Sequence, residues 1–409
     1  MNHKVAVVGM AGITALGDNW PGVAAGLKRL KNAVCYMPQW EEFRGLQTKV
    51  AAPIVSFDVP AYYTRRQLRS MSRVSLFATR ATELSLEQAG LLHDPLLHSG
   101  ELGIAYGSSA GSAQSVEEFG ALLRRHDTHE IGTTTYVKMM PHTTAVNIGV
   151  FFGITGRIIP TSSACTSGSQ AIGYAFECIK HGYQTVMVAG GAEELTVGDS
   201  AVFDLMYAAS LRNDSPAQTP RPFDVKRDGL VIGEGAATLV LEEWEHARAR
   251  GAPILAEVVG FATNSDGTHV TKPNEETIRR CLQLSLEGAG LPPEAIGYIS
   301  AHGTATKLGD LAESRATYSI FGSHTPISSL KSYFGHSLGA CGAIEAWLTL
   351  KMQEEGWFAP TLNLEQVDPK CGELDYIRGA LRELQCEYVQ SNNFAFGGVN
   401  TSLIFRRTR

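Results

Sequence analysis

The sequence has few charged residues and no excess of positive charge. Asp, Glu, Lys and Arg make up 19% of the 409 residues, and 35 basic against 41 acidic residues give a formal net charge of -6. A chain without a basic excess lacks the overall field that attracts nucleic acid. Hydrophobic residues make up 44% of the chain, which argues against intrinsic disorder. We therefore expect a folded protein that does not bind nucleic acid.

The sequence also lacks the cysteine pattern of a zinc site or a disulfide framework. Its seven cysteines include no C-x-x-C pair, and none is clustered with histidine at zinc spacing. No apolar run approaches the roughly 20 residues that cross a bilayer, and no A-x-A cleavage site follows the apolar stretch near the start. Dinucleotide-binding and Walker A motifs are absent. We expect reduced thiols in a cytoplasmic protein without metal, cofactor or membrane contact.

Short apolar segments alternate with helical patterns along the whole chain, which predicts an α/β fold. The predicted strands are residues 4–9, 102–106, 185–188, 237–241, 255–259, 298–300 and 402–405. The Val-Val-Gly-Phe segment at 258–261 repeats the Val-Val-Gly-Met segment at 7–10. This repeat suggests a duplication whose second half begins near residue 253. No Pro-, Gly- and Ser-rich linker separates the halves, so we expect a rigid interface with a site between them.

Cys165 lies where a predicted strand turns into a predicted helix. The segment 157–160, apolar from Ile158 onward, leads through small residues into a helical pattern at 171–176. A helix N-terminus offers unpaired N–H groups and partial positive charge, which stabilise a thiolate. A buried, unreactive cysteine is equally consistent with this segment.

Two of the 12 histidines lie in Gly-containing loops at the ends of predicted elements. His302 follows the strand at 298–300, and His336 precedes an apolar helical stretch. Functional side chains are concentrated in such loops. Lys331 and Glu345 lie on either side of His336 in the sequence, and taken alone they would form an exposed ion pair. Two other histidines, His142 and His269, lie near Thr-rich segments, and we expect His269 to be nearer the site.

Five motifs occur together in an order typical of one enzyme family. They are Ser-Ala-Cys-Thr-Ser-Gly at 163–168, Arg-Pro-Phe-Asp to Arg-Asp-Gly at 221–229, Ala-His-Gly-Thr at 301–304, the segment 331–339, and Asn-Phe-Ala-Phe-Gly-Gly-Val-Asn at 393–400. With them the sequence resembles the β-ketoacyl-acyl carrier protein synthases, condensing enzymes of the thiolase superfamily, over nearly its whole length. The resemblance implies a duplicated five-layered αβαβα fold. Residues 1–252 would form the half with the nucleophile, and residues 253–409 the half with both histidines.

The resemblance also implies a decarboxylative Claisen condensation that needs no cofactor. Cys165 would take the acyl chain from an acyl carrier protein, with the backbone N–H groups of Cys165 and Phe396 as oxyanion hole. His302 and His336 would stabilise the enolate formed when the malonyl group loses carbon dioxide. The remaining family positions are supporting residues (Lys331, Glu345, Asp310 and Glu313) and substrate contacts (Ala110, Phe203, Thr304, Thr306 and Phe394).

The expected partner is an acyl carrier protein, which is acidic and needs a local positive surface on a net negative enzyme. We predict this surface at Arg65, Arg66, Arg69 and Arg73, whose spacing would place several on one helix face. The alternative is that these arginines form a helix face that contacts only solvent. The resemblance implies a homodimer through a strand at about 157–163, with residues 134–145 reaching the partner's pocket, and leaves a heterodimer open.

Two departures from the elongation-enzyme pattern leave the substrate open. Ala110 stands where many relatives have a bulky aliphatic residue, and Lys307 where they commonly have proline. A synthase specialised for polyketide or aryl polyene chains is therefore an alternative to housekeeping fatty acid elongation. A non-catalytic chain-length-factor-like subunit is a further alternative, against which Cys165 argues. A serine hydrolase would use Ser109, in the Gly-Ser-Ser-Ala-Gly segment at 107–111.

Overall fold

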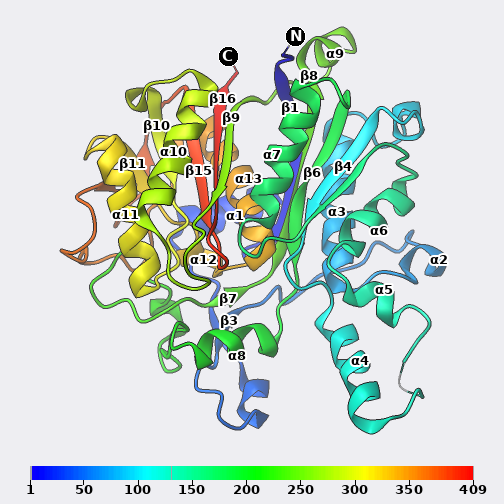
Figure 1. The fold of residues 1–409 in the computed structure, drawn as a ribbon, viewed down its shortest axis with the longest axis horizontal. Coiled ribbons are helices and arrows are strands. Elements are labelled where there is room, and N and C mark those ends of the chain that lie inside the picture. The colour runs from blue at the N-terminus through cyan, green and yellow to red at the C-terminus, as the bar shows by residue number, and fades with distance from the viewer. Residues whose placement is uncertain (1, 130, 409) are drawn as a thin grey trace.

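A mixed sheet of eleven strands passes through the computed structural model, which describes residues 2–129 and 131–408 (Figure 1). The strand order is β13-β11-β10-β15-β16-β9-β1-β8-β6-β4-β5. The strands are β1 (Val5–Thr14), β4 (Leu102–Gly107), β5 (Ile158–Thr161), β6 (Val186–Glu193), β8 (Gly235–Glu243), β9 (Ala256–Ser265), β10 (Ile296–Ser300), β11 (Pro326–Ser328), β13 (Asp375–Tyr376), β15 (Tyr388–Phe394) and β16 (Val399–Arg407). Each of the seven predicted strand segments overlaps one of them.

The sheet consists of two halves with the same topology. In the first half, β4 pairs in parallel with β5 on one side and with β6 on the other. β8 then pairs antiparallel with β6, and β1 pairs antiparallel with β8. In the second half β11 and β15 flank β10 in parallel, and β16 and β9 follow antiparallel. The halves join where β1 pairs with β9. The repeated Val-Val-Gly segments lie in these two equivalent strands, in agreement with the predicted duplication.

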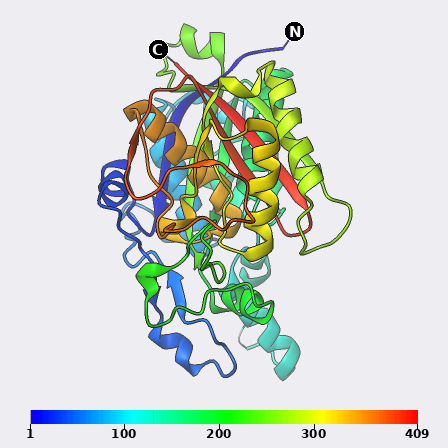
Figure 2. The same ribbon diagram turned by 90° about the vertical axis from the view of Figure 1, so that its left-hand side faces the viewer.

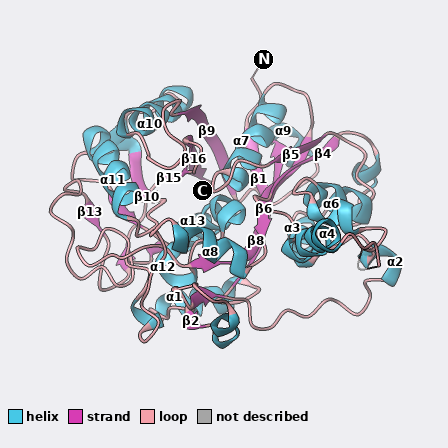
Figure 3. Ribbon diagram, turned by 60° about the horizontal axis from the view of Figure 1, so that its bottom comes forward, coloured by secondary structure: helices cyan, strands magenta, loops and turns pink. Residues whose placement is uncertain are grey.

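Helices form three layers around the two half-sheets. They are α1 (Trp20–Lys28), α2 (Arg65–Leu68), α3 (Arg73–Gln88), α4 (Ala113–Arg125), α5 (Thr135–Met139), α6 (Thr143–Phe152), α7 (Ser167–Lys180), α8 (Val197–Leu205), α9 (Trp244–Ala249), α10 (Glu275–Ala289), α11 (Lys307–Phe321), α12 (Lys331–Phe334) and α13 (Cys341–Glu355). Helices α3 and α6 cover the first half-sheet, α10 with α11 beside it covers the second, and α7 and α13 lie between them (Figure 3). This is the expected five-layered arrangement. The boundary at residue 252 remains a prediction.

Short strands complete the fold. β2 (Cys35–Tyr36), β3 (Val50–Ala52) and β7 (Ile232–Gly233) form one small sheet, and β12 (Trp357–Phe358) pairs with β14 (Arg382–Glu383). None of the helices in the described part of the chain has the length and apolar character needed to cross a bilayer.

Glycines explain an error in the predicted length of β1. The first predicted strand ends at Gly9, whereas β1 continues to Thr14. A Cβ atom on Gly9 would lie 2.2 Å from the carbonyl oxygen of Ser85 in α3. Gly260 has the equivalent place in β9, with its Cβ position 2.8 Å from the oxygen of Ser285 in α10. These glycines allow a helix to approach the strand closely and do not mark a turn.

The two central helices begin beside each other in the interior. A Cβ atom on Gly168 of α7 would lie 3.0 Å from the backbone nitrogen of Ala343, and one on Gly342 of α13 would lie 2.8 Å from that of Ser169. Both chain termini lie at the top of the molecule in Figures 1 and 2, and α8 lies at the opposite end. The fold thus brings two helix N-termini, one from each half, to a single place.

Candidate active site

Cys165 lies in a tight turn between β5 and α7. β5 ends at Thr161 and α7 begins at Ser167. Ala164 has a left-handed backbone with φ of 52°, which is costly for a residue other than glycine and is found mainly at functional turns. The backbone N–H of Ser163 donates to Ser167 Oγ at 2.9 Å and holds the turn. The strand-to-helix elbow predicted from the sequence is present.

The fold brings both predicted histidines to Cys165. His336 Nε2 lies 3.0 Å from Cys165 Sγ, and the ring centroids of His302 and His336 are 5.3 Å apart. One ligand atom from each of the three side chains lies within 4.8 Å of the others. All three residues are buried. A thiol and two imidazoles therefore face the same small volume.

Buried carboxylates hold the loop that carries His302. Glu313 accepts hydrogen bonds from the backbone N–H groups of His302 and Gly303, both at 2.7 Å. Asp310 accepts one from the N–H of Thr304 at 3.0 Å. Burial raises the pKa of Glu313 to about 8 and that of Asp310 to about 6. Both side chains therefore fix the backbone of the loop that carries His302.

Lys331 and Glu345 form a buried ion pair, in contrast to the exposed pair that they would suggest in isolation. Their side chains are 1% and 0% exposed. Burial acts to lower the pKa of Lys331, but the charge of Glu345, its hydrogen bond to the ammonium group and the contributions of other buried groups together outweigh burial, so that the pKa is raised. Asn393 Nδ2 donates to the second carboxylate oxygen of Glu345 at 2.7 Å and lies 3.5 Å from His302 Nδ1. Asn393 was part of a recognised motif but was not predicted as a site residue.

Burial controls the protonation of the three central side chains. It raises the pKa of Cys165 to about 11, although the charge of Lys331 lowers that pKa. Burial and Lys331 together hold the pKa of His302 and of His336 well below the ordinary range of histidine. The resting site therefore contains a neutral thiol and neutral imidazoles. The thiolate that we expected from the helix N-terminus is opposed by burial.

Two backbone N–H groups are directed at the thiol. They belong to Phe396 and to Cys165 itself, and both lower the thiol pKa. Phe396 lies in the loop between β15 and β16, where the N–H of Gly397 donates to the carbonyl oxygen of Val270 at 2.7 Å. Two convergent N–H donors can stabilise a carbonyl oxygen that gains negative charge.

A cavity of about 440 Å³ extends from Cys165 and the two histidines toward the surface. Of the predicted substrate contacts, four line it: Phe203, Thr304, Thr306 and Phe394. Ala110 does not line this cavity; it is exposed, and its N–H donates to Glu193 at 3.2 Å. His269 lines the cavity and His142 does not, as expected.

Glu193, at the end of β6, was missed by the motif analysis. It accepts hydrogen bonds from the N–H groups of Ser109 at 2.7 Å and Gly339 at 3.0 Å, and from Ser108 Oγ at 2.9 Å. It thereby connects the loop after β4 to the loop that follows His336. Burial raises its pKa to about 7. The only signal in the sequence was an acidic residue at the end of an apolar strand.

The hydrolase alternative finds no support at Ser109. Within the described residues, no hydrogen bond joins the Ser109 hydroxyl to a histidine. A serine nucleophile requires such a base. The Gly-rich turn around Ser109 is instead part of the support for the Cys165 site.

The four arginines predicted to bind the carrier protein do not lie on one helix. Helix α2 ends at Leu68 before Arg69, and α3 begins at Arg73, because the extended backbone of Ser72 interrupts the helix. Arg73 Nη2 pairs with the buried Glu234 at 2.8 Å. Arg65, Arg66 and Arg69 remain exposed. The expectation of a shared helix face was wrong, and Arg73 has a structural contact.

Among the described residues, one group of side chains is close enough together to hold a metal ion: Cys165, His302 and His336. The raised pKa of the Cys165 thiol opposes this use, since the thiolate is the metal ligand. The absence of a metal therefore remains our prediction.

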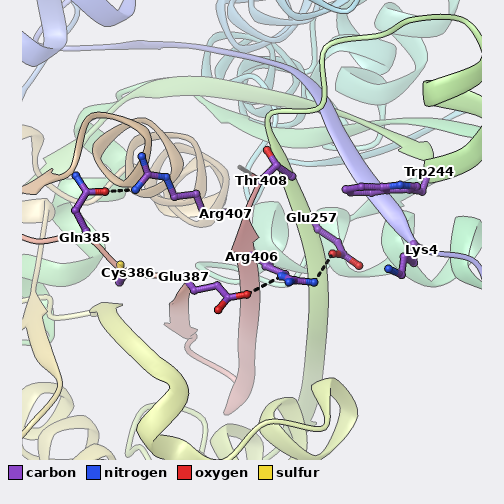
Figure 4. Close-up of a pocket in the computed structure, with 9 residues that line it drawn as sticks. All are labelled: Lys4, Trp244, Glu257, Gln385, Cys386, Glu387, Arg406, Arg407 and Thr408. Atoms are coloured by element: carbon purple, nitrogen blue, oxygen red, sulfur yellow. Dashed lines mark hydrogen bonds and ion pairs between the residues drawn. The ribbon is translucent and has the colours of Figure 1, made fainter.

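A second groove lies near the chain termini, and Lys4, Trp244 and Thr408 are among the residues that line it (Figure 4). Its two acidic side chains are engaged, since Arg406 pairs with Glu387 at 2.9 Å and with Glu257 at 3.7 Å. Lys4 lies over the ring of Trp244, and Arg407 donates a hydrogen bond to Gln385. Its thiol, Cys386, has a pKa raised to about 11 by burial, and no histidine lines the groove. It lacks the paired groups that nucleophilic catalysis needs.

Comparisons with known proteins agree with this geometry. The chain matches the family models of the β-ketoacyl synthase N-terminal domain over residues 2–247 and C-terminal domain over residues 255–365. It is 34% identical to the 3-oxoacyl-[acyl-carrier-protein] synthase 2 of Synechocystis sp., with 99% of this chain and 98% of that protein covered.

Two solved structures align with this chain over 100% of its length and over 100% of their own. One is a β-ketoacyl synthase from Burkholderia phymatum, with a TM-score of 0.98 and 58% identity. The other is a type II PKS ketosynthase in complex with its acyl-carrier protein and bound to the hexaketide, with a TM-score of 0.88 and 27% identity. The chain therefore belongs to the β-ketoacyl synthase family, acyltransferases that form carbon-carbon bonds and have the thiolase-like fold.

Proposed function

We propose that the chain joins an acyl group held on Cys165 to malonyl-acyl carrier protein, releasing carbon dioxide and giving a 3-oxoacyl-acyl carrier protein. The observation that carries this proposal is the 3.0 Å contact of Cys165 Sγ with His336 Nε2, in a cavity that also holds His302. The printed name of the Synechocystis relative describes the same product class.

In the first step, Cys165 Sγ attacks the carbonyl carbon of an acyl thioester. The thiol loses its proton as it attacks, helped by the charge of Lys331, which lowers the thiol pKa. The N–H groups of Cys165 and Phe396 stabilise the oxyanion. The carrier thiol leaves with a proton, so that one thioester is exchanged for another.

In the second step, the malonyl thioester loses carbon dioxide. The electrons of the broken carbon-carbon bond form an enolate, whose oxygen accepts hydrogen bonds from N–H groups of His302 and His336. The depressed pKa values of both rings support this role, since neutral imidazoles can donate without carrying a charge. The enolate carbon then attacks the acyl carbonyl, and Cys165 leaves as a thiolate. Lys331 supplies a fixed positive charge beside this chemistry.

The proposed assembly is a homodimer through β5. This strand is the last in the sheet order, and Ile158 on it is 40% exposed, so its outer edge can pair with a second strand. The predicted partner-reaching segment, residues 134–145, lies against Gly111, whose Cβ position is 2.6 Å from the carbonyl oxygen of Met139. Ala110 would then face a pocket completed by the partner. A heterodimer remains the alternative assembly.

The carrier protein is proposed to dock on Arg65 and Arg66, which are exposed on α2, and on Arg69, which is exposed directly after it. Arg73 is left out because it is paired with Glu234. The ketosynthase neighbour solved with its acyl-carrier protein supports a partner of this kind.

A specialised synthase for polyketide or aryl polyene chains is the second candidate. The observations that favour it are Ala110 and Lys307, which depart from the elongation-enzyme pattern, and the neighbour bound to a hexaketide. The two candidates share the reaction and differ in the acyl chain.

Intact-protein and peptide mass spectrometry tests both candidates. The enzyme is mixed with saturated and polyenoyl carrier proteins and then with malonyl-carrier protein. We expect an acyl mass on Cys165 that disappears as a two-carbon-longer product forms, and the preferred donor distinguishes the candidates. Cys165→Ala should abolish the adduct, while Cys178→Ala, which removes another buried thiol in the last turn of α7, should retain it. Wild-type turnover by Cys165→Ala would overturn the proposal, and no adduct from any donor would favour a non-catalytic subunit.

A further inference from the structure

The mouth of the Cys165 cavity carries two lysines and a histidine. Lys272, Lys307 and His269 all line the cavity and are exposed. Among the described residues, neither lysine ammonium group has a hydrogen-bond or ion-pair partner. The mouth therefore presents two uncompensated positive charges in a chain whose formal net charge is -6.

The acidic residues of the same cavity are already engaged. Asp228 accepts hydrogen bonds from Ser210 Oγ at 3.0 Å and from the N–H of Leu211 at 3.1 Å, and it lies 3.5 Å from Arg212 Nε. Asp266 is 7% exposed and accepts a hydrogen bond from Asn400 Nδ2 at 2.8 Å. Asp228 is thus paired with Arg212, and Asp266 accepts from neutral donors and forms no ion pair with either lysine among the described residues.

His269 is oriented by its own loop. Its Nδ1 accepts hydrogen bonds from the backbone N–H groups of Thr271 at 3.1 Å and Lys272 at 3.2 Å. Its ring proton is therefore on Nε2, which is left as a donor. The same contacts hold the ring and the Lys272 backbone together on one side of the mouth.

Lys307 lies at the start of α11, a helix of 15 residues. Its own positive charge is added to the partial positive charge of the helix N-terminus. The proline that relatives commonly have at this place could supply no charge. This departure from the family pattern therefore creates a stronger anion-binding position than the fold alone would provide.

We propose that Lys272, Lys307 and His269 bind the phosphate of a phosphopantetheine arm while its thioester lies in the cavity. This inference rests on the proposed function, because it assumes that a pantetheine thioester enters toward Cys165. Phosphate is the anion on such an arm, and two ammonium groups with a neutral imidazole donor match its oxygen acceptors. The phosphate could belong to a carrier protein or to coenzyme A, which share this chemistry.

The test compares two small donors that differ only in the phosphate. Acylation of Cys165 is followed by mass spectrometry with hexanoyl-phosphopantetheine and hexanoyl-pantetheine, and the phosphate preference is the ratio of the two kcat/KM values. We expect a preference of about tenfold, equivalent to about 1.4 kcal/mol, that falls as salt is added. The double variant Lys272→Met/Lys307→Met should bring the ratio close to one. Lys307→Pro should remove part of the preference.

Matched controls separate the outcomes. Lys31→Met/Lys370→Met removes two other exposed lysines and should retain the wild-type ratio. A wild-type ratio of one, or a double variant that keeps the preference, would overturn this inference while leaving the proposed function intact. Absence of Cys165 acylation by every donor would instead contradict the proposed function. Adding hexanoyl-coenzyme A and hexanoyl-carrier protein shows which source of phosphate gains most from the two lysines.

Discussion

The loops after β4 and after β10 have equivalent places in the two halves, and each is held by a buried glutamate. Glu193 accepts the N–H of Ser109 after β4, and Glu313 accepts the N–H of His302 after β10. The second loop carries an imidazole into the cavity, whereas the first contributes backbone and small side chains. The duplicated fold therefore supplies the same kind of support twice, and the side chains on the loops decide the chemistry.

The two glutamates also differ in their electrostatic surroundings. For Glu313 the backbone N–H groups of Gly303 and His302 oppose burial, while the charge of Asp310 adds to it. The charge of Lys331 makes a smaller contribution that also lowers the pKa of Glu313. For Glu193 the backbone N–H groups of Ser109 and Ala110 oppose burial, while the charge of Asp199 adds to it. Both glutamates are thus held mainly by backbone N–H donors, and Glu313 in addition lies near the buried cation Lys331.

Removing that cation should have the largest effect. Lys331→Met leaves Glu345 buried without its partner, and loss of one member of a buried pair costs about 3–5 kcal/mol. We expect the free energy of unfolding to fall by that amount in urea titrations, and condensation to be lost. The double variant Lys331→Met/Glu345→Gln should recover much of the stability but not the condensation. If the single variant were as stable as wild type, the pair would not have the structural role assigned here.

Weakening the glutamate behind His302 should have the next largest effect. Glu313→Gln places an amide where two backbone N–H groups donate, so one hydrogen bond is lost and His302 shifts. A small displacement of a catalytic group can cost about 100-fold in rate, and we expect that loss in malonyl decarboxylation. Acylation of Cys165 should fall much less, because His302 acts in the second step. Equal losses in both steps, measured on the same preparation, would mean that Glu313 supports the whole site.

The features that could be predicted are those that depend on residues close together in the sequence. The elbow at Cys165 and the loops of His302 and His336 follow from local motifs, and the seven strands follow from apolar patterns. Glu193 was missed because its partner Ser109 is 84 residues away, and nothing local indicates their contact. The burial of Lys331 likewise depends on packing between the halves. The break between α2 and α3 was missed because the arginine spacing was read as one continuous helix.

The smallest effect should come from Glu193 and should depend on pH. Its pKa is about 7 in the folded protein against an ordinary value of 4.5, so the folded state binds this proton more tightly than the unfolded state. Between these values stability should fall as pH rises, by at most about 1.4 kcal/mol per pH unit. Glu193→Gln removes this dependence, so its stability relative to wild type should improve from pH 5 to pH 7 in urea titrations. The exposed Glu117→Gln on α4 is the control and should follow wild type. Parallel profiles for Glu193→Gln and wild type would show that its N–H donors keep Glu193 ionised over this pH range.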